Sequence, residues 1–121
     1  MRHAAVAIAL ALTGTSAPAM PVSTFLSKFE SLDPNGASTA LTRDLGALRA
    51  ELQKDASELR AERLAAVSAG TKPAYCPGAG GAQPGAKEII AALEEIAEAD
   101  RPFIEVKDAL RAYLAARFPC Y

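Results

Sequence analysis

The chain has 121 residues, two cysteines, one histidine and no tryptophan, and this length fits one small domain. Its 13 basic and 14 acidic side chains leave a formal net charge of −1. That balance excludes the strongly basic surface by which proteins bind nucleic acid, and it provides no electrostatic attraction to anionic membranes.

The start of the chain has the layout of a secretory signal peptide. A positively charged beginning precedes an uninterrupted apolar run over residues 4–12, and residues 17–19 place small side chains at the two positions that a signal peptidase reads. The apolar run is too short to span a bilayer, which needs about 20 residues. We therefore expect residues 1–19 to be cleaved and residues 20–121 to form one periplasmic or secreted domain without a membrane anchor.

Cleavage at that point would remove the only histidine, His3. Without an imidazole, the mature chain cannot form the Ser-His or Cys-His pair that activates a nucleophile. Zinc sites that use histidine, or three or more thiolates, are excluded as well. The composition therefore predicts a protein that is not an enzyme and that holds neither a cofactor nor a metal ion.

Apolar residues at helical spacing predict helices along most of the mature chain. The first runs from about residue 22 to residue 32 and ends at a turn sequence, residues 33–36. Its apolar face consists of Val22, Phe25, Leu26, Phe29 and Leu32. The second helix is long, about residues 39–69, with a break near residues 54–56 as an alternative. Gly70 suits its left-handed C-terminal cap.

A leucine stripe follows the long helix, and Ala56 is expected to fill the seam between two of its members. The stripe consists of Leu41, Leu45, Leu48, Leu52, Leu59 and Leu64. A sustained heptad would place Asp55 and Glu62 at core positions, which favours a stripe that faces the core of its own domain over a long coiled coil. A homodimer through part of this helix is the second arrangement left open.

A loop rich in glycine and proline, residues 70–85, separates the long helix from the last two predicted helices. The third helix is expected over about residues 86–98, with its apolar face formed by Ile89, Ile90, Leu93 and Ile96. Asp100 is expected to cap the last helix, and Pro102 to occupy its first turn, where the missing N–H costs nothing. This helix should bury Phe103, Val106, Leu110, Tyr113 and Leu114.

The two cysteines, Cys76 and Cys120, predict one disulfide, because an even cysteine count in an exported domain is typical of a bridge. Closing a loop of about 44 residues stabilises a fold by about 4 kcal/mol in the chain-entropy account. Two buried free thiols are the alternative. Tyr75 and Tyr121 would flank the bridge, either packing around it or forming an edge for a partner. The predicted fold is therefore all-α: a small bundle of four main helices, one long, with one disulfide.

Carboxylates are concentrated on the third predicted helix and just after it: Glu88, Glu94, Glu95, Glu98 and Asp100. Glu94 and Glu98 are expected one helical turn apart on the same face. Acid–base catalysis by such a pair needs a cleft that separates the two pKa values. An exposed helix face favours either a solvated surface or a contact patch for a basic partner.

Two short motifs frame the C-terminal half of the chain, Tyr-Cys-Pro at residues 75–77 and Phe-Pro-Cys at residues 118–120. With the two amphipathic helices between them, they resemble the Rap/Tai family over roughly residues 75–120. The last helix is also similar to that of the family at Val106, Ala109 and Leu110. Members of this family are small exported helical proteins of bacteria that act as immunity proteins against type VI secretion effectors.

The resemblance implies a non-enzymatic periplasmic binding protein that neutralises a secreted peptidoglycan hydrolase by steric occlusion. The five carboxylates, or the loop from Pro77 to Pro84, would then contact the partner. Two alternatives are a periplasmic acid-stress chaperone and a structural envelope protein. The chaperone is suggested by the 14 acidic groups, which can protonate together in acid.

Overall fold

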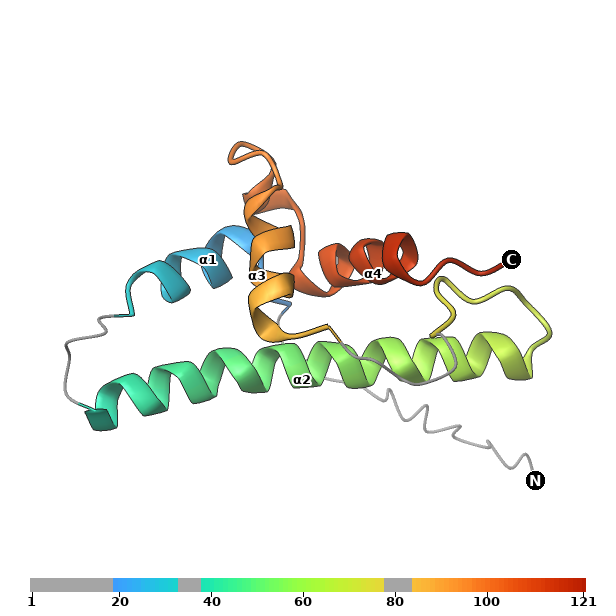
Figure 1. The fold of residues 1–121 in the computed structure, drawn as a ribbon, viewed down its shortest axis with the longest axis horizontal. Helices are drawn as coiled ribbons and strands as arrows, with labels where there is room; N and C mark the ends of the chain where they lie inside the picture. Colours follow the sequence, from blue (N-terminus) through green and yellow to red (C-terminus); the bar gives the residue numbers. More distant parts are fainter. Residues whose placement is uncertain (1–18, 33–37, 78–83) are drawn as a thin grey trace, which may run out of the picture.

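The computed structural model describes residues 19–32, 38–77 and 84–121, which form four α-helices and one short 3-10 helix (Figure 1). The elements are α1 (Val22–Glu30), α2 (Ser38–Ser68), α3 (Ala86–Glu94), η1 (Arg101–Phe103) and α4 (Val106–Arg117). The predicted all-α fold with one long helix is confirmed. Residues 1–18 of the predicted signal peptide and the predicted turn at residues 33–36 lie outside the described residues.

Helix α2 is the longest element, and α1, α3 and α4 all lie on one side of it (Figure 1). It continues without a break through residues 54–56, and Gly70 just beyond it takes a left-handed φ of +74°, as predicted. The main core lies where α1 and α4 meet the middle of α2, and its buried residues are Val22, Phe25, Leu26, Leu48, Leu93 and Val106. None of the described helices combines the length and the apolar character that crossing a membrane requires.

The leucine stripe of α2 is buried only in its middle. Leu48 and Leu59 are buried, whereas Leu45 and Leu64 are 41% and 50% exposed. The side chain of Leu41 lies outside the described residues. The prediction that the whole stripe faces the core was wrong at Leu45 and Leu64, which belong to neither apolar cluster of the fold. These exposed leucines are the part of the stripe available to the homodimer considered above.

A short antiparallel contact joins the start of α1 to the start of α4. Val22 N–H donates to the Ile104 carbonyl at 2.8 Å, and Val106 N–H donates to the Met20 carbonyl at 2.9 Å. Pro21 lies between the two bonds, where its lack of an N–H leaves no ladder bond unmade. The contact fixes the beginning of the domain against its last helix.

The predicted disulfide between Cys76 and Cys120 is present, with an S–S distance of 2.05 Å, so the alternative of free thiols does not hold. The Cys76 N–H also donates to the Phe118 carbonyl at 2.8 Å. Together they hold the segment after α2 against the end of α4. Tyr75 is buried there with Leu59, Leu110 and Leu114 in a second apolar cluster, while Tyr121 is fully exposed.

Helix α3 is shorter than predicted and ends at Glu94 instead of residue 98. The Arg101 guanidinium folds back over this end, with Nε donating to the Ile96 carbonyl at 2.9 Å and Nη2 donating to the Glu94 carbonyl at 2.8 Å. A helix end leaves carbonyls without partners, and a cation there also complements the helix dipole. The residues predicted to face inward are buried (Leu93) or half-buried (Ile89, Ile90 and Ile96).

Helix α4 begins at Val106, later than predicted. Asp100 forms no side-chain cap, and Pro102 lies in η1 instead of α4. Phe103, which was predicted to be buried, is 87% exposed. The cause is the pairing of residues 104–105 with residues 20–22, since this pairing holds both in an extended conformation and delays the helix.

Candidate functional site

The five carboxylates singled out from the sequence do not form one patch. Glu88 lies in the first turn of α3 and faces α4, where its Oε2 is 3.9 Å from Nη2 of Arg117 and accepts a bond from the Tyr113 hydroxyl at 3.5 Å. The other four are exposed at or beyond the opposite end of α3: Glu94, Glu95, Glu98 and Asp100. Glu98 lies outside the helix, so the predicted one-turn pair with Glu94 was wrong.

The connection from α3 through η1, residues 94–103, forms a projection that we call the α3–η1 tip. It extends from the bundle on the side away from α2 (Figure 1). Four carboxylates and the 87% exposed Phe103 lie on this short segment. Its one basic side chain, Arg101, is engaged with backbone carbonyls. The tip therefore presents an aromatic ring on an acidic segment.

The chain's own contacts hold this tip in shape. Besides the bonds from the arginine, Asp100 N–H donates to the Ala97 carbonyl at 2.8 Å, and Phe103 N–H donates to the Asp100 carbonyl at 3.0 Å. Ile96 and Ile104 pack against the main core. A binding segment that is ordered before it meets a partner loses less conformational freedom on binding.

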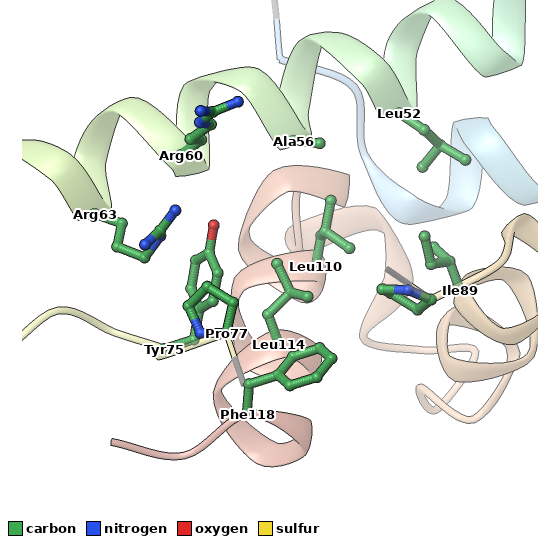
Figure 2. Close-up of a pocket in the computed structure, with 11 residues that line it drawn as sticks. Leu52, Ala56, Arg60, Arg63, Tyr75, Pro77, Ile89, Leu110, Leu114 and Phe118 are labelled. Atoms are coloured by element: carbon green, nitrogen blue, oxygen red, sulfur yellow. The ribbon is translucent and has the colours of Figure 1, made fainter. Parts of the chain in front are cut away.

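A pocket of about 300 Å³ opens between α2, the start of α3 and α4, and we call it the α2–α4 pocket (Figure 2). Its apolar lining consists of Leu52, Ala56, Ile89, Leu110, Leu114 and Phe118. Its polar lining consists of Arg60, Arg63 and Tyr75. Pro77 and Pro84, the ends of the loop predicted to contact a partner, also line it, while residues 78–83 lie outside the described residues.

The pocket exists because a small side chain occupies a position between leucines. Ala56 was expected to fill the seam of the leucine stripe, but it is exposed and lines the pocket instead. From α4, Leu110 and Leu114 lie one turn apart and form part of the same wall. An alanine among leucines was the sequence signal for this space. Whether that alanine leaves a pocket or fills a seam depends on where α4 lies, which the local sequence does not determine.

Two arginines of α2 give the pocket its charge. The Cζ of Arg63 is 5.6 Å from the centroid of the Tyr75 ring, in cation–π contact (Figure 2). Its Nε is buried and has no hydrogen-bond partner among the described residues. Arg60 lies one turn earlier on the same face and is exposed. In the described ranges, neither guanidinium forms a salt bridge.

The cations of α4 nearest to α2 are, by contrast, paired with carboxylates. Arg111 donates to Glu62 at 2.9 to 3.2 Å and also to Asp108 at 2.6 Å. Lys107 Nζ lies 3.3 Å from Glu58 and 3.2 Å from Glu62. The hydrogen bonds from Arg111, and then from Lys107, lower the pKa of Glu62. The pairs with Glu58 and Glu62 join α2 to α4, whereas Arg111 and Asp108 pair within α4. Each of these half-exposed pairs contributes about 1 kcal/mol or less.

Asp55 is a buried charged residue on α2, with 3% of its surface exposed. Its Oδ2 has no hydrogen-bond partner among the described residues. Burial, reinforced by the negative charge of Glu51, raises the pKa of Asp55 from 3.8 to about 6. The position that argued against a coiled coil is thus buried within the domain itself.

The chemistry of the pocket is suited to binding. Guanidinium groups stay protonated in proteins and donate planar pairs of hydrogen bonds, so they orient an anion but do not remove protons. Throughout the described ranges, no group of three or more histidine, cysteine, aspartate or glutamate side chains is placed to hold a metal ion.

No protein-family model, curated protein or solved structure matches this chain.

Proposed function

We propose that this chain is a non-enzymatic binding protein of the bacterial periplasm that uses the α3–η1 tip to occlude the cleft of a secreted peptidoglycan hydrolase. The resemblance to the Rap/Tai immunity proteins suggests this class of partner. The observation that carries the proposal is Phe103, which is 87% exposed on a segment held in shape by internal hydrogen bonds.

Such a tip has the properties of a protein-binding element. Aromatic side chains are enriched at the centres of protein interfaces, and burying a phenylalanine in an apolar recess of a partner contributes about 1.5–3 kcal/mol. The four carboxylates of the tip complement a basic rim around that recess and accelerate its approach. A hydrolase cleft that is apolar at its centre and basic at its edge would fit this arrangement.

Protection of cells tests the proposal directly. Bacteria that export the wild-type protein are challenged with periplasm-targeted peptidoglycan amidases, one at a time, and survival is counted. We expect protection against one of these amidases, loss of protection in Phe103→Asp, and full protection in the matched control Tyr121→Asp, which alters an exposed aromatic residue elsewhere.

The same three proteins are then titrated against the neutralised amidase by calorimetry. A one-to-one complex that Phe103→Asp weakens at least tenfold supports occlusion by the tip. Protection against none of the amidases would refute the function, and unchanged binding by Phe103→Asp would show that the tip is not the contact surface.

A further inference from the structure

We infer that the α2–α4 pocket is a binding site for a fatty carboxylate, a single unbranched acyl chain that ends in a carboxylate group. The chain would lie against the apolar wall, and the carboxylate would be held by Arg63 and Arg60. This site is separate from the α3–η1 tip and does not depend on the partner proposed for it.

The wall and the size of the pocket favour one acyl chain. Leucine, isoleucine and phenylalanine side chains from α2, α3 and the end of α4 surround the space, and Ala56 leaves it open (Figure 2). Its volume of about 300 Å³ lies at the lower end of the range of ligand pockets. A two-chain phospholipid would be too large, whereas a single chain of medium length fits this class of pocket.

The charge at the pocket favours an anion. The Nε of Arg63 is buried without an acceptor, and a buried donor left without a partner is costly. A carboxylate in the pocket would accept from the Arg63 guanidinium, whose planar shape allows two parallel bonds. Arg60 on the same face adds a second positive charge at the pocket.

Covalent and hydrogen-bonded contacts on one side of the pocket favour a space that persists without a ligand. Tyr75 and Phe118 lie in two different segments, one after α2 and one after α4. The disulfide of Cys76 and the bond from the Cys76 N–H to the Phe118 carbonyl hold these two segments together, so both side chains line the same pocket. The ring of Tyr75 in turn supports the Arg63 guanidinium from one side. The acceptor position beside that guanidinium is therefore defined before a ligand arrives.

Calorimetric titration of the oxidised protein tests the inference with three ligands of one chain length, the two ionic ligands below their micelle concentrations and the alcohol below its solubility limit. We expect decanoate to bind one-to-one, decanol to bind about tenfold more weakly, and decyltrimethylammonium not to bind, because only the carboxylate is negatively charged and offers two acceptor oxygens to the guanidinium groups. Equal binding of decanoate and decanol would overturn the role of the arginines. Absence of decanoate binding would refute the pocket as a site for a fatty carboxylate.

Variants locate the binding site. Arg63→Gln is expected to weaken decanoate about tenfold while leaving decanol unchanged, and Ala56→Leu is expected to abolish binding of both by filling the space. Arg49→Gln, on the exposed side of the same helix, is the matched control and should bind like wild type. If Ala56→Leu does not fold, the decanoate-to-decanol ratio in Arg63→Gln still decides the question.

Binding by Phe103→Asp separates the two proposals. We expect this tip variant to bind decanoate normally even where it no longer protects cells. Decanoate affinity that falls with Phe103→Asp but not with Arg63→Gln would place the ligand at the tip and refute the pocket.

Discussion

A single buried carboxylate sets the response of this fold to mildly acidic pH. The pKa of Asp55 is about 6 in the folded protein, compared with its ordinary value of 3.8. Between these two values the folded protein holds a proton that the unfolded chain has released, so stability rises as pH falls through this window. Glu62 acts in the opposite sense at lower pH, because a lowered pKa contributes stability above 4.5 that is lost on further acidification.

We therefore expect the free energy of unfolding, measured by urea denaturation, to increase from pH 7 to about pH 4.5. The gain over this range has an upper limit of about 2 kcal/mol, since stability changes by about 1.36 kcal/mol for each pH unit between a pKa of about 6 and pH 4.5. Asp55→Asn should raise stability at pH 7 and flatten the dependence. Asp44→Asn, exposed on the same helix, should leave the slope intact, and an equal slope in Asp55→Asn would contradict this account.

The direction of this effect bears on the acid-stress chaperone considered from the composition. Such a protein must open as its carboxylates become protonated. Protonation of Asp55 favours the closed fold instead, down to about its ordinary pKa of 3.8. Opening would need the loss of other pairs, such as those of Glu62, at still lower pH.

At the scale of the elements, the α3–η1 tip depends on one side chain. Arg101 satisfies two carbonyls at the end of α3 and thereby holds the segment that carries Phe103. Arg101→Ala should cost about 1–2 kcal/mol of stability and should accelerate amide hydrogen exchange at residues 96–104. Exchange within α2 serves as the internal reference, and Arg101→Lys should give an intermediate rate. Unchanged exchange in Arg101→Ala would show that the tip is held by other contacts.

The elements differ in how far local sequence determines them. Periodicity correctly predicted α1 and α2, and the glycine at the C-terminal cap correctly predicted the left-handed Gly70, because these features depend on neighbours along the chain. It failed at the start of α4, where the local signals of Asp100 and Pro102 are overridden by pairing with residues 20–22, some 80 positions away. The pocket was missed for a related reason: Ala56 reads as a seam residue until α4 is placed beside it.

At the scale of the whole molecule, the proposed export and the disulfide should both change the mass of the protein. The proposed route predicts a periplasmic protein that begins near Met20 and is lighter by the two thiol hydrogens lost in joining Cys76 to Cys120. Non-reducing mass spectrometry of a periplasmic extract measures both features at once, and reduction should restore the missing mass. A full-length, reduced protein recovered from the cytosol would contradict the assigned location.

The antiparallel contact around Pro21 has a practical consequence for anyone who modifies this protein. Met20 and Val22 both form backbone hydrogen bonds with the segment around the start of α4. Aminopeptidase trimming past residue 20 would therefore remove a contact that holds α1 against α4. An affinity tag placed ahead of Ala19 would leave those bonds intact, since Ala19 is exposed. At this end the domain should tolerate extension but not shortening past residue 20.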